Sequence, residues 1–118
     1  MSDENSWVTV CGEEVLAPDT GVCAMLGGEQ VAIFRVGQTG QVFAVSNYDP
    51  IGEANVLSRG IIGSLGDEIV VASPLYKQHF SLKTGACLEQ VDCSLKTYPV
   101  RLHRGEVQLR SARQLQSV

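Results

Sequence analysis

The chain has 118 residues, enough for one domain with a core of its own. It carries 9 basic and 13 acidic residues, and its net charge of −4 argues against the basic surface of a nucleic-acid-binding protein. No run of about 18 apolar residues is present, so we expect no membrane span. Residues 1–5 are acidic and polar, unlike a secretory signal, so we expect a cytoplasmic protein.

The 4 cysteines are Cys11, Cys23, Cys87 and Cys93. An even count is compatible with two disulfides, but cytoplasmic thiols stay reduced. No Cys-x-x-Cys or Cys-x-His spacing of a zinc or iron–sulfur site occurs. We therefore interpret the cysteines as small buried or half-buried residues.

Short apolar segments separated by glycine-containing turns follow one another along the chain. We predict strands at 7–11, 22–26, 30–36, 41–46, 61–62 and 68–72. This spacing is typical of an antiparallel β-barrel or sandwich. No segment shows a sustained 3.6-residue apolar period, so we expect little helix, with one short turn at 54–57.

The last part of the chain predicts two hairpins. Segments 80–82 and 86–88 flank the turn at 83–85, and apolar residues alternate with polar ones in 100–103 and 106–110. This alternation places His103 on the solvent face. We predict a disordered N-terminus at 1–6, a single domain at 7–110 and a flexible tail at 111–118.

Two loops, at 47–60 and 73–79, contain a recognisable pattern. Rieske ferredoxin domains read Asn-x-Cys-Pro-His and Leu-Ser-x-Gly in the first loop, and Cys-Pro-x-His-x-x-x-Phe in the second, followed by Thr-Gly. The matching residues here are Asn47, Pro50, Leu57, Ser58, Gly60, Pro74, Phe80, Thr84 and Gly85. The chain therefore resembles a Rieske domain, which implies an all-β, Rieske-like barrel or sandwich with two tip loops.

The four ligand positions of the Rieske pattern depart from it. Asp49 and Ser73 stand where the cysteines belong, and Ile51 and Tyr76 stand where the histidines belong. A Rieske centre needs two thiolates on one iron and two imidazoles on the other. Isoleucine has no donor atom, and oxygen ligands are poor substitutes for thiolate and imidazole. We therefore expect no cofactor and no metal on this chain.

Six blocks of sequence narrow the resemblance to the small subunits of bacterial NADH-dependent assimilatory nitrite reductases. The blocks lie at 19–24, 29–35, 41–47, 56–60, 71–75 and 107–110. The resemblance implies an oxidoreductase complex that reduces nitrite to ammonium with electrons from NADH. It places FAD, a 4Fe–4S cluster and sirohaem on the large subunit, which is the expected partner. This chain would complete or stabilise that subunit and carry no catalytic residue.

Two other classes of function remain open. One is a stand-alone Rieske-fold module that binds another protein. The other is a ferredoxin-like electron carrier whose cluster is held through Cys87 and Cys93, although their spacing does not favour it.

Without a cluster, other contacts must hold the two loops together. We expect Ile51 to bury apolar surface between the loops, and the Tyr76 hydroxyl to donate a hydrogen bond to Asp49. Aromatic and apolar side chains at an exposed tip are typical of protein interfaces. The candidate partner interface comprises Tyr48, Ile51, Leu75, Tyr76 and Lys77.

Overall fold

The computed structural model describes residues 6–110. The predicted tail at 111–118 and the predicted disordered N-terminus, apart from Ser6, lie outside the described residues. The predicted all-β fold with antiparallel sheets is confirmed. The strands are β1 (Val8–Gly12), β2 (Gly21–Leu26), β3 (Glu29–Arg35), β4 (Val42–Ser46), β5 (Tyr48–Asp49), β6 (Ala54–Asn55), β7 (Ile61–Leu65), β8 (Glu68–Ala72), β9 (His79–Ser81), β10 (Val100–His103) and β11 (Glu106–Leu109).

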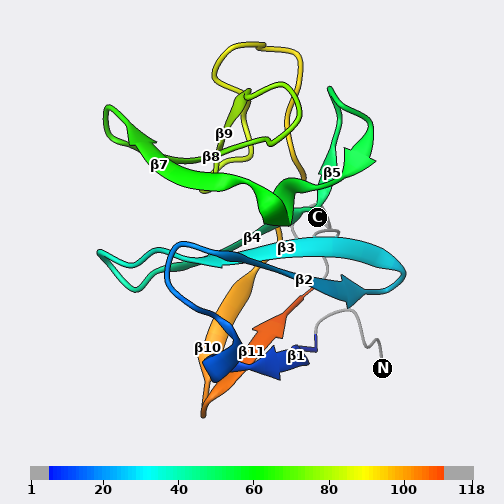
Figure 1. Cartoon of the computed structure of the whole chain (residues 1–118). Coiled ribbons are helices and arrows are strands. Elements are labelled where there is room, and N and C mark those ends of the chain that lie inside the picture. Colours follow the sequence, from blue (N-terminus) through cyan, green and yellow to red (C-terminus); the bar gives the residue numbers. More distant parts are fainter. Residues whose placement is uncertain (1–5, 111–118) are drawn as a thin grey trace, which may run out of the picture.

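The strands form three stacked sheets (Figure 1). The sheet β2-β3-β4 lies in the middle, the sheet β7-β8-β9 covers one side, and the sheet β1-β11-β10 covers the other. The short pair β5-β6 belongs to the first tip loop. No helix in the described part of the chain has the length and apolar character to cross a membrane.

Strand β3 is buried on both faces because it separates two cores. Val31 and Ile33 contribute to the core shared with β11, and Ala32 and Phe34 to the core shared with β8 and β9. Successive side chains of a strand point to opposite faces, so one strand can serve both cores. The near-continuous apolar run of β3 follows from this position. Full burial of the Phe34 side chain contributes about 3 kcal/mol to the stability of the fold.

Glycines set the turn between β2 and β3. Gly27 and Gly28 have φ of +57° and +85°, and they connect Leu26 to its partner Glu29. Two successive positive φ values are the signature of a type I′ hairpin turn, which glycine adopts without strain. The predicted hairpin is confirmed, and it fixes the register of the central sheet.

Two local predictions differ from the structure, the first wholly and the second in part. The predicted helical turn at 54–57 begins later, as a 3-10 turn at Leu57–Arg59, because Ala54 and Asn55 pair with β5 instead. The segment 86–88 forms isolated bridges in place of a regular strand. Its predicted pairing with 80–82 is present in part, because Phe80 bridges Cys87 and the Ser81 N–H donates to Ala86 O at 2.8 Å. The same segment also contacts 93–95, through the Cys87 N–H to Cys93 O at 3.2 Å.

The cysteines are free and differ in exposure. Cys87 is buried, Cys11 and Cys93 are half-buried, and Cys23 is exposed. The interpretation as buried or half-buried residues therefore fails at Cys23. That side chain lies on β2, an edge strand of the central sheet, where one face meets solvent.

Candidate functional site

Asn47 organises the first tip loop from within the protein. Its side chain is 2% exposed, donates to Gln30 Oε1 at 3.0 Å and accepts from the Ser58 N–H at 2.7 Å. Its backbone carbonyl accepts from the Leu57 N–H at 3.0 Å. These bonds join the two ends of the loop and attach it to β3. The Rieske-pattern residues Asn47, Leu57 and Ser58 thus support the scaffold without any cluster.

The two positions that hold cysteines in a Rieske domain contact each other directly. The Ser73 hydroxyl donates a hydrogen bond to Asp49 Oδ2, and both side chains are at most 1% exposed. Asp49 Oδ1 accepts from the N–H groups of Ile51 at 2.8 Å and Gly52 at 3.1 Å. Ser73 Oγ accepts from the Leu75 N–H at 3.2 Å. One buried carboxylate therefore ties the two tip loops together through protein groups alone.

The predicted bond between Tyr76 and Asp49 was wrong. The Tyr76 side chain is 64% exposed, and the side chain that donates to Asp49 is that of Ser73. A short serine side chain reaches the buried carboxylate without carrying a bulky ring into the interior. Ile51 is half-buried and packs against the core cluster that contains Leu57 and Phe80, so its expected apolar contact is present.

Beyond this buried tie, the tip presents apolar and aromatic side chains outward. Tyr48 is 44% exposed, Leu75 43% and Tyr76 64%. Lys77 is also exposed, has a φ of +65°, and its ammonium lies 3.4 Å from the Pro74 carbonyl oxygen. Of the five residues in the predicted interface, four are exposed, while Ile51 is half-buried.

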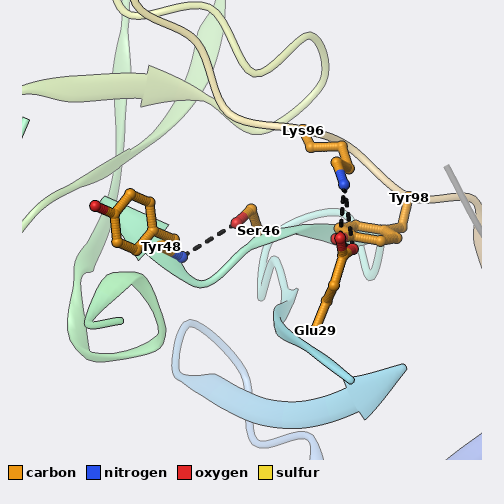
Figure 2. A network of polar contacts seen from close by, with 5 residues as sticks. All are labelled: Glu29, Ser46, Tyr48, Lys96 and Tyr98. Carbon is orange, nitrogen blue, oxygen red and sulfur yellow. Dashed lines mark hydrogen bonds and ion pairs between the residues drawn. The ribbon is translucent and has the colours of Figure 1, made fainter. Parts of the chain in front are cut away.

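Figure 2 shows a polar cluster of Glu29, Lys96 and Tyr98. Together with Tyr48, these residues line a hollow of about 290 Å³. Lys96 Nζ lies 2.9 Å from Glu29 Oε2, and the Tyr98 hydroxyl donates to Glu29 Oε1 at 2.6 Å. Burial, reinforced by the bond to Glu29, raises the pKa of Tyr98 well above its ordinary value. Tyr98 therefore keeps its proton near neutral pH. The cluster attaches the start of β3 to the segment before β10.

His79, at the end of the second tip loop, is held by Glu89. Its Nδ1 lies 2.6 Å from Glu89 Oε2, and its backbone N–H donates to Glu89 Oε1 at 2.8 Å. The backbone bond first, and the side-chain bond second, lower the pKa of Glu89 below its ordinary value of 4.5. His79 is thus paired with Glu89, while Asp49 is paired with Ser73.

Sequence reasoning missed the His79–Glu89 pairing and two bonds that are longer in range. The Asp49–Ser73 bond joins residues 24 positions apart, and the Tyr98–Glu29 bond joins residues 69 apart. For the first, a signal was present: both substitutes at the cysteine positions are short and polar, and they can pair with each other. For the second, the sequence offered no pattern.

Comparison with known proteins identifies the family. The family model described as Rieske-like [2Fe-2S] domain matches residues 6–110. The nitrite reductase (NADH) small subunit of Salmonella typhimurium is 52% identical over 106 residues, covering 90% of this chain and 98% of that one. This chain belongs to the family of nitrite reductase (NADH) small subunits. The NMR structure of the Escherichia coli protein NirD is 51% identical, with a TM-score of 0.82 over 90% of this chain and 96% of that one.

One relative carries the same domain within a longer chain. The NAD(P)H nitrite reductase large subunit of Klebsiella oxytoca is 40% identical over 101 residues. The match covers 86% of this chain and 10% of that protein. In that relative, a domain of this kind is covalently part of the large subunit.

The residues at the ligand positions do not fit the cluster in the family model's description. Asp49 already accepts three hydrogen bonds, and Ser73 donates one of them. Ile51 has no donor atom, and the Tyr76 phenol is a poor replacement for imidazole. Among residues 6–110 no three His, Cys, Asp or Glu side chains are grouped as a metal site, and this holds for Cys87 and Cys93 as well.

Proposed function

We propose that this chain is the small, non-redox subunit of an NADH-dependent nitrite reductase and acts by binding the large catalytic subunit. The observation that carries the proposal is the tip: its two loops are tied by Asp49 and Ser73, and its four ligand positions hold no thiolate and no imidazole. The tip therefore has no group that could carry electrons, but its loops still present a surface that can bind another protein. The Klebsiella oxytoca relative, in which such a domain is part of the large subunit, supports the same partner.

In this proposal the chemistry belongs to the partner. The large subunit reduces nitrite to ammonium with electrons from NADH, using FAD, a 4Fe–4S cluster and sirohaem. The small subunit supplies no catalytic residue and completes or stabilises the holoenzyme. Its location is the cytoplasm, where the NADH pool lies.

The proposed docking surface is the tip. Tyr48, Leu75 and Tyr76 expose apolar and aromatic area there, and Lys77 adds a positive charge at the edge. Tyrosine is enriched in interface cores because a rigid ring buries a large area at small entropic cost. Ile51 packs against the core and so supports the first tip loop from its inner side.

The test is co-expression with the large subunit, followed by size-exclusion chromatography and NADH-driven nitrite turnover. We expect co-elution, and loss of turnover when the small chain is omitted. A Leu75→Ala, Tyr76→Ala double variant should bind at least about tenfold more weakly, the loss expected from two interface anchors. Val15→Ala is the matched control, because Val15 is 48% exposed and lies on the 3-10 turn after β1, in the opposite layer.

Two results would count against the proposal. If the wild-type chain elutes alone and turnover is unchanged without it, the subunit role is wrong. If the double variant and the Val15 variant bind equally well, the subunit role stands and the tip is not the docking surface.

A further inference from the structure

Strand β7 has an open edge. Within residues 6–110 it pairs only with β8, and the other side of β7 has no strand beside it. The β7–β8 hairpin turns through two residues, Gly66 and Asp67, with Leu65 opposite Glu68. In such a hairpin, the residues next to the turn exchange hydrogen bonds, and every second residue does so thereafter.

This register decides which backbone groups face outward. Leu65, Gly63 and Ile61 bond to β8, so the N–H and C=O groups of Ile62 and Ser64 point away from the sheet. No backbone hydrogen bond outside the β7–β8 pairing reaches Ile62 or Ser64 within the described residues. The edge therefore offers two donors and two acceptors to another strand.

The edge also lacks the features that proteins use to prevent such pairing. Its sequence, Ile-Ile-Gly-Ser-Leu, has no charge and no proline, and its register with β8 shows no bulge. Ile61 is 73% exposed and Leu65 44% exposed. A Cβ atom at Gly63 would meet nothing within 4 Å, so the strand surface between these two side chains is open.

Hollows lie on both faces of the edge. One, of about 310 Å³, lies between β7 and the turn that joins β3 to β4, and is lined by Ile62, Ser64, Gln38 and Thr39. The other, of about 130 Å³, is lined by Ile61, Leu65, Val70 and Ala72. Figure 1 shows β7 at the outer side of its sheet, above the β3–β4 turn. The first hollow exposes more polar than apolar surface, and the second more apolar than polar. Because successive side chains of an added strand point to opposite faces, its polar side chains would suit the first hollow and its apolar ones the second.

Charges at the two ends of β7 specify the added strand further. Asp67 and Glu68 lie at the hairpin end and have no ion-pair partner among the described residues. Arg59 precedes β7 at the other end and is likewise without an ion-pair partner in residues 6–110. A strand with a basic residue near Asp67 and Glu68 and an acidic residue near Arg59 would match both ends.

We propose that β7 is a strand-addition site, and that a short extended segment of the large nitrite reductase subunit pairs with its open edge. The inference rests on the proposed function for the identity of the partner. The segment alternates apolar and polar side chains, carries a basic residue at the Asp67 end, and bonds to the backbone of Ile62 and Ser64. Main-chain bonds supply affinity and the two hollows supply specificity, as in other strand-addition complexes. Ile61 pairs with Ala72, which directly precedes the second tip loop, so this surface is continuous with the proposed tip interface.

The first test is hydrogen exchange of the co-purified complex and of the isolated chain, read out after quenching at single residues. In the isolated chain, the amides of Ile62 and Ser64 should exchange fast, and that of Gly63 slowly. In the complex, Ile62 and Ser64 should become protected at least about tenfold, because both then donate to a neighbouring strand. Val15, at the opposite layer, should not change.

The second test removes one outward donor. Ser64→Pro deletes the N–H that the added strand uses and breaks no bond to β8, whereas Ser64→Thr keeps the N–H and suits a strand. We expect Ser64→Pro to bind the large subunit at least about tenfold more weakly than Ser64→Thr, the effect of losing backbone bonds and strand alignment. Circular dichroism of the isolated variants checks that both fold, and the exchange test remains decisive should Ser64→Pro fail to fold.

The outcomes separate the two proposals. Co-elution without protection of Ile62 and Ser64 overturns strand addition and leaves the subunit role intact. Failure of the wild-type chain to co-elute overturns both. If Ile62 and Ser64 are already protected in the isolated chain and it elutes as a dimer, the edge binds a second copy, and the large subunit is the wrong occupant.

Discussion

Removal of the Ser73 hydroxyl tests whether the buried tie holds the tip loops together. Ser73→Ala leaves the Asp49 carboxylate with the N–H donors of Ile51 and Gly52 but without its link to the second loop. A hydrogen bond to a charged acceptor is worth about 1.5–3 kcal/mol, and both groups are at most 1% exposed. We therefore expect the free energy of unfolding to fall by about 2–3 kcal/mol. For 118 residues the unfolding entropy is roughly 0.25 kcal/mol/K, so Tm should fall by about 8–12 °C.

Thermal unfolding by circular dichroism, paired with urea titration, measures this loss. Ser46→Ala is the control: the Ser46 hydroxyl accepts a single hydrogen bond, from the Tyr48 N–H at 3.1 Å, at an exposed position, so its loss should cost about 0.5 kcal/mol. Asp49→Asn should cost less than Ser73→Ala, because the amide oxygen can still accept from Ile51 and Gly52 while its NH₂ donates to Ser73. A Ser73→Ala variant no less stable than Ser46→Ala would refute the tie.

Three further predictions concern other parts of the fold. Tyr98→Phe should lower the free energy of unfolding by about 1 kcal/mol in urea titration, with an unchanged m-value, because Glu29 is half exposed and keeps Lys96 as a partner. Glu89→Gln should reduce Tm at pH 7, because the pKa of Glu89 is lowered in the folded state. The stability that this carboxylate contributes is present above about pH 4.5 and is lost as pH falls through the folded-state pKa. The difference in Tm between Glu89→Gln and wild type should therefore disappear in acid. Gly85→Ala should cost at least about 2 kcal/mol by thermal unfolding, because φ there is +84° and a Cβ would lie 2.1 Å from the Leu95 carbonyl oxygen; a cost below 1 kcal/mol would mean that the turn relaxes easily.

Much of the fold was readable from the sequence because its signals are local. The pair Gly27 and Gly28 predicts the β2–β3 hairpin, since two positive φ values are nearly exclusive to glycine and a few short polar residues. Period-two alternation predicts the β10–β11 hairpin, in which Val107 and Leu109 are buried. The predictions at 54–57 and 86–88 failed in part because neighbouring segments take up their backbone groups: Ala54 and Asn55 pair with β5, and Ala86 and Cys87 form only isolated bridges with nearby residues.

The candidate site divides in the same way. The chemistry of four side chains shows that they cannot hold an iron–sulfur cluster, and this needs no coordinates: Asp49, Ile51, Ser73 and Tyr76. The sequence does not show which of them links the two loops in place of the cluster. The Tyr76 hydroxyl can donate to the Asp49 carboxylate by donor and acceptor type. In the folded protein Asp49 is buried, and the smaller Ser73 donates to it.

Family membership, the all-β class and the absence of cluster ligands were therefore determined by the residues in their order, because each depends on side-chain chemistry or on turns a few residues long. The Asp49–Ser73 tie and the open edge of β7 were decided by tertiary structure. A bond across 24 residues requires both loops to be brought to the same end of the fold. The edge is open because no other strand of residues 6–110 packs beside β7, which is a property of the assembled sheets and not of the segment Ile61–Leu65.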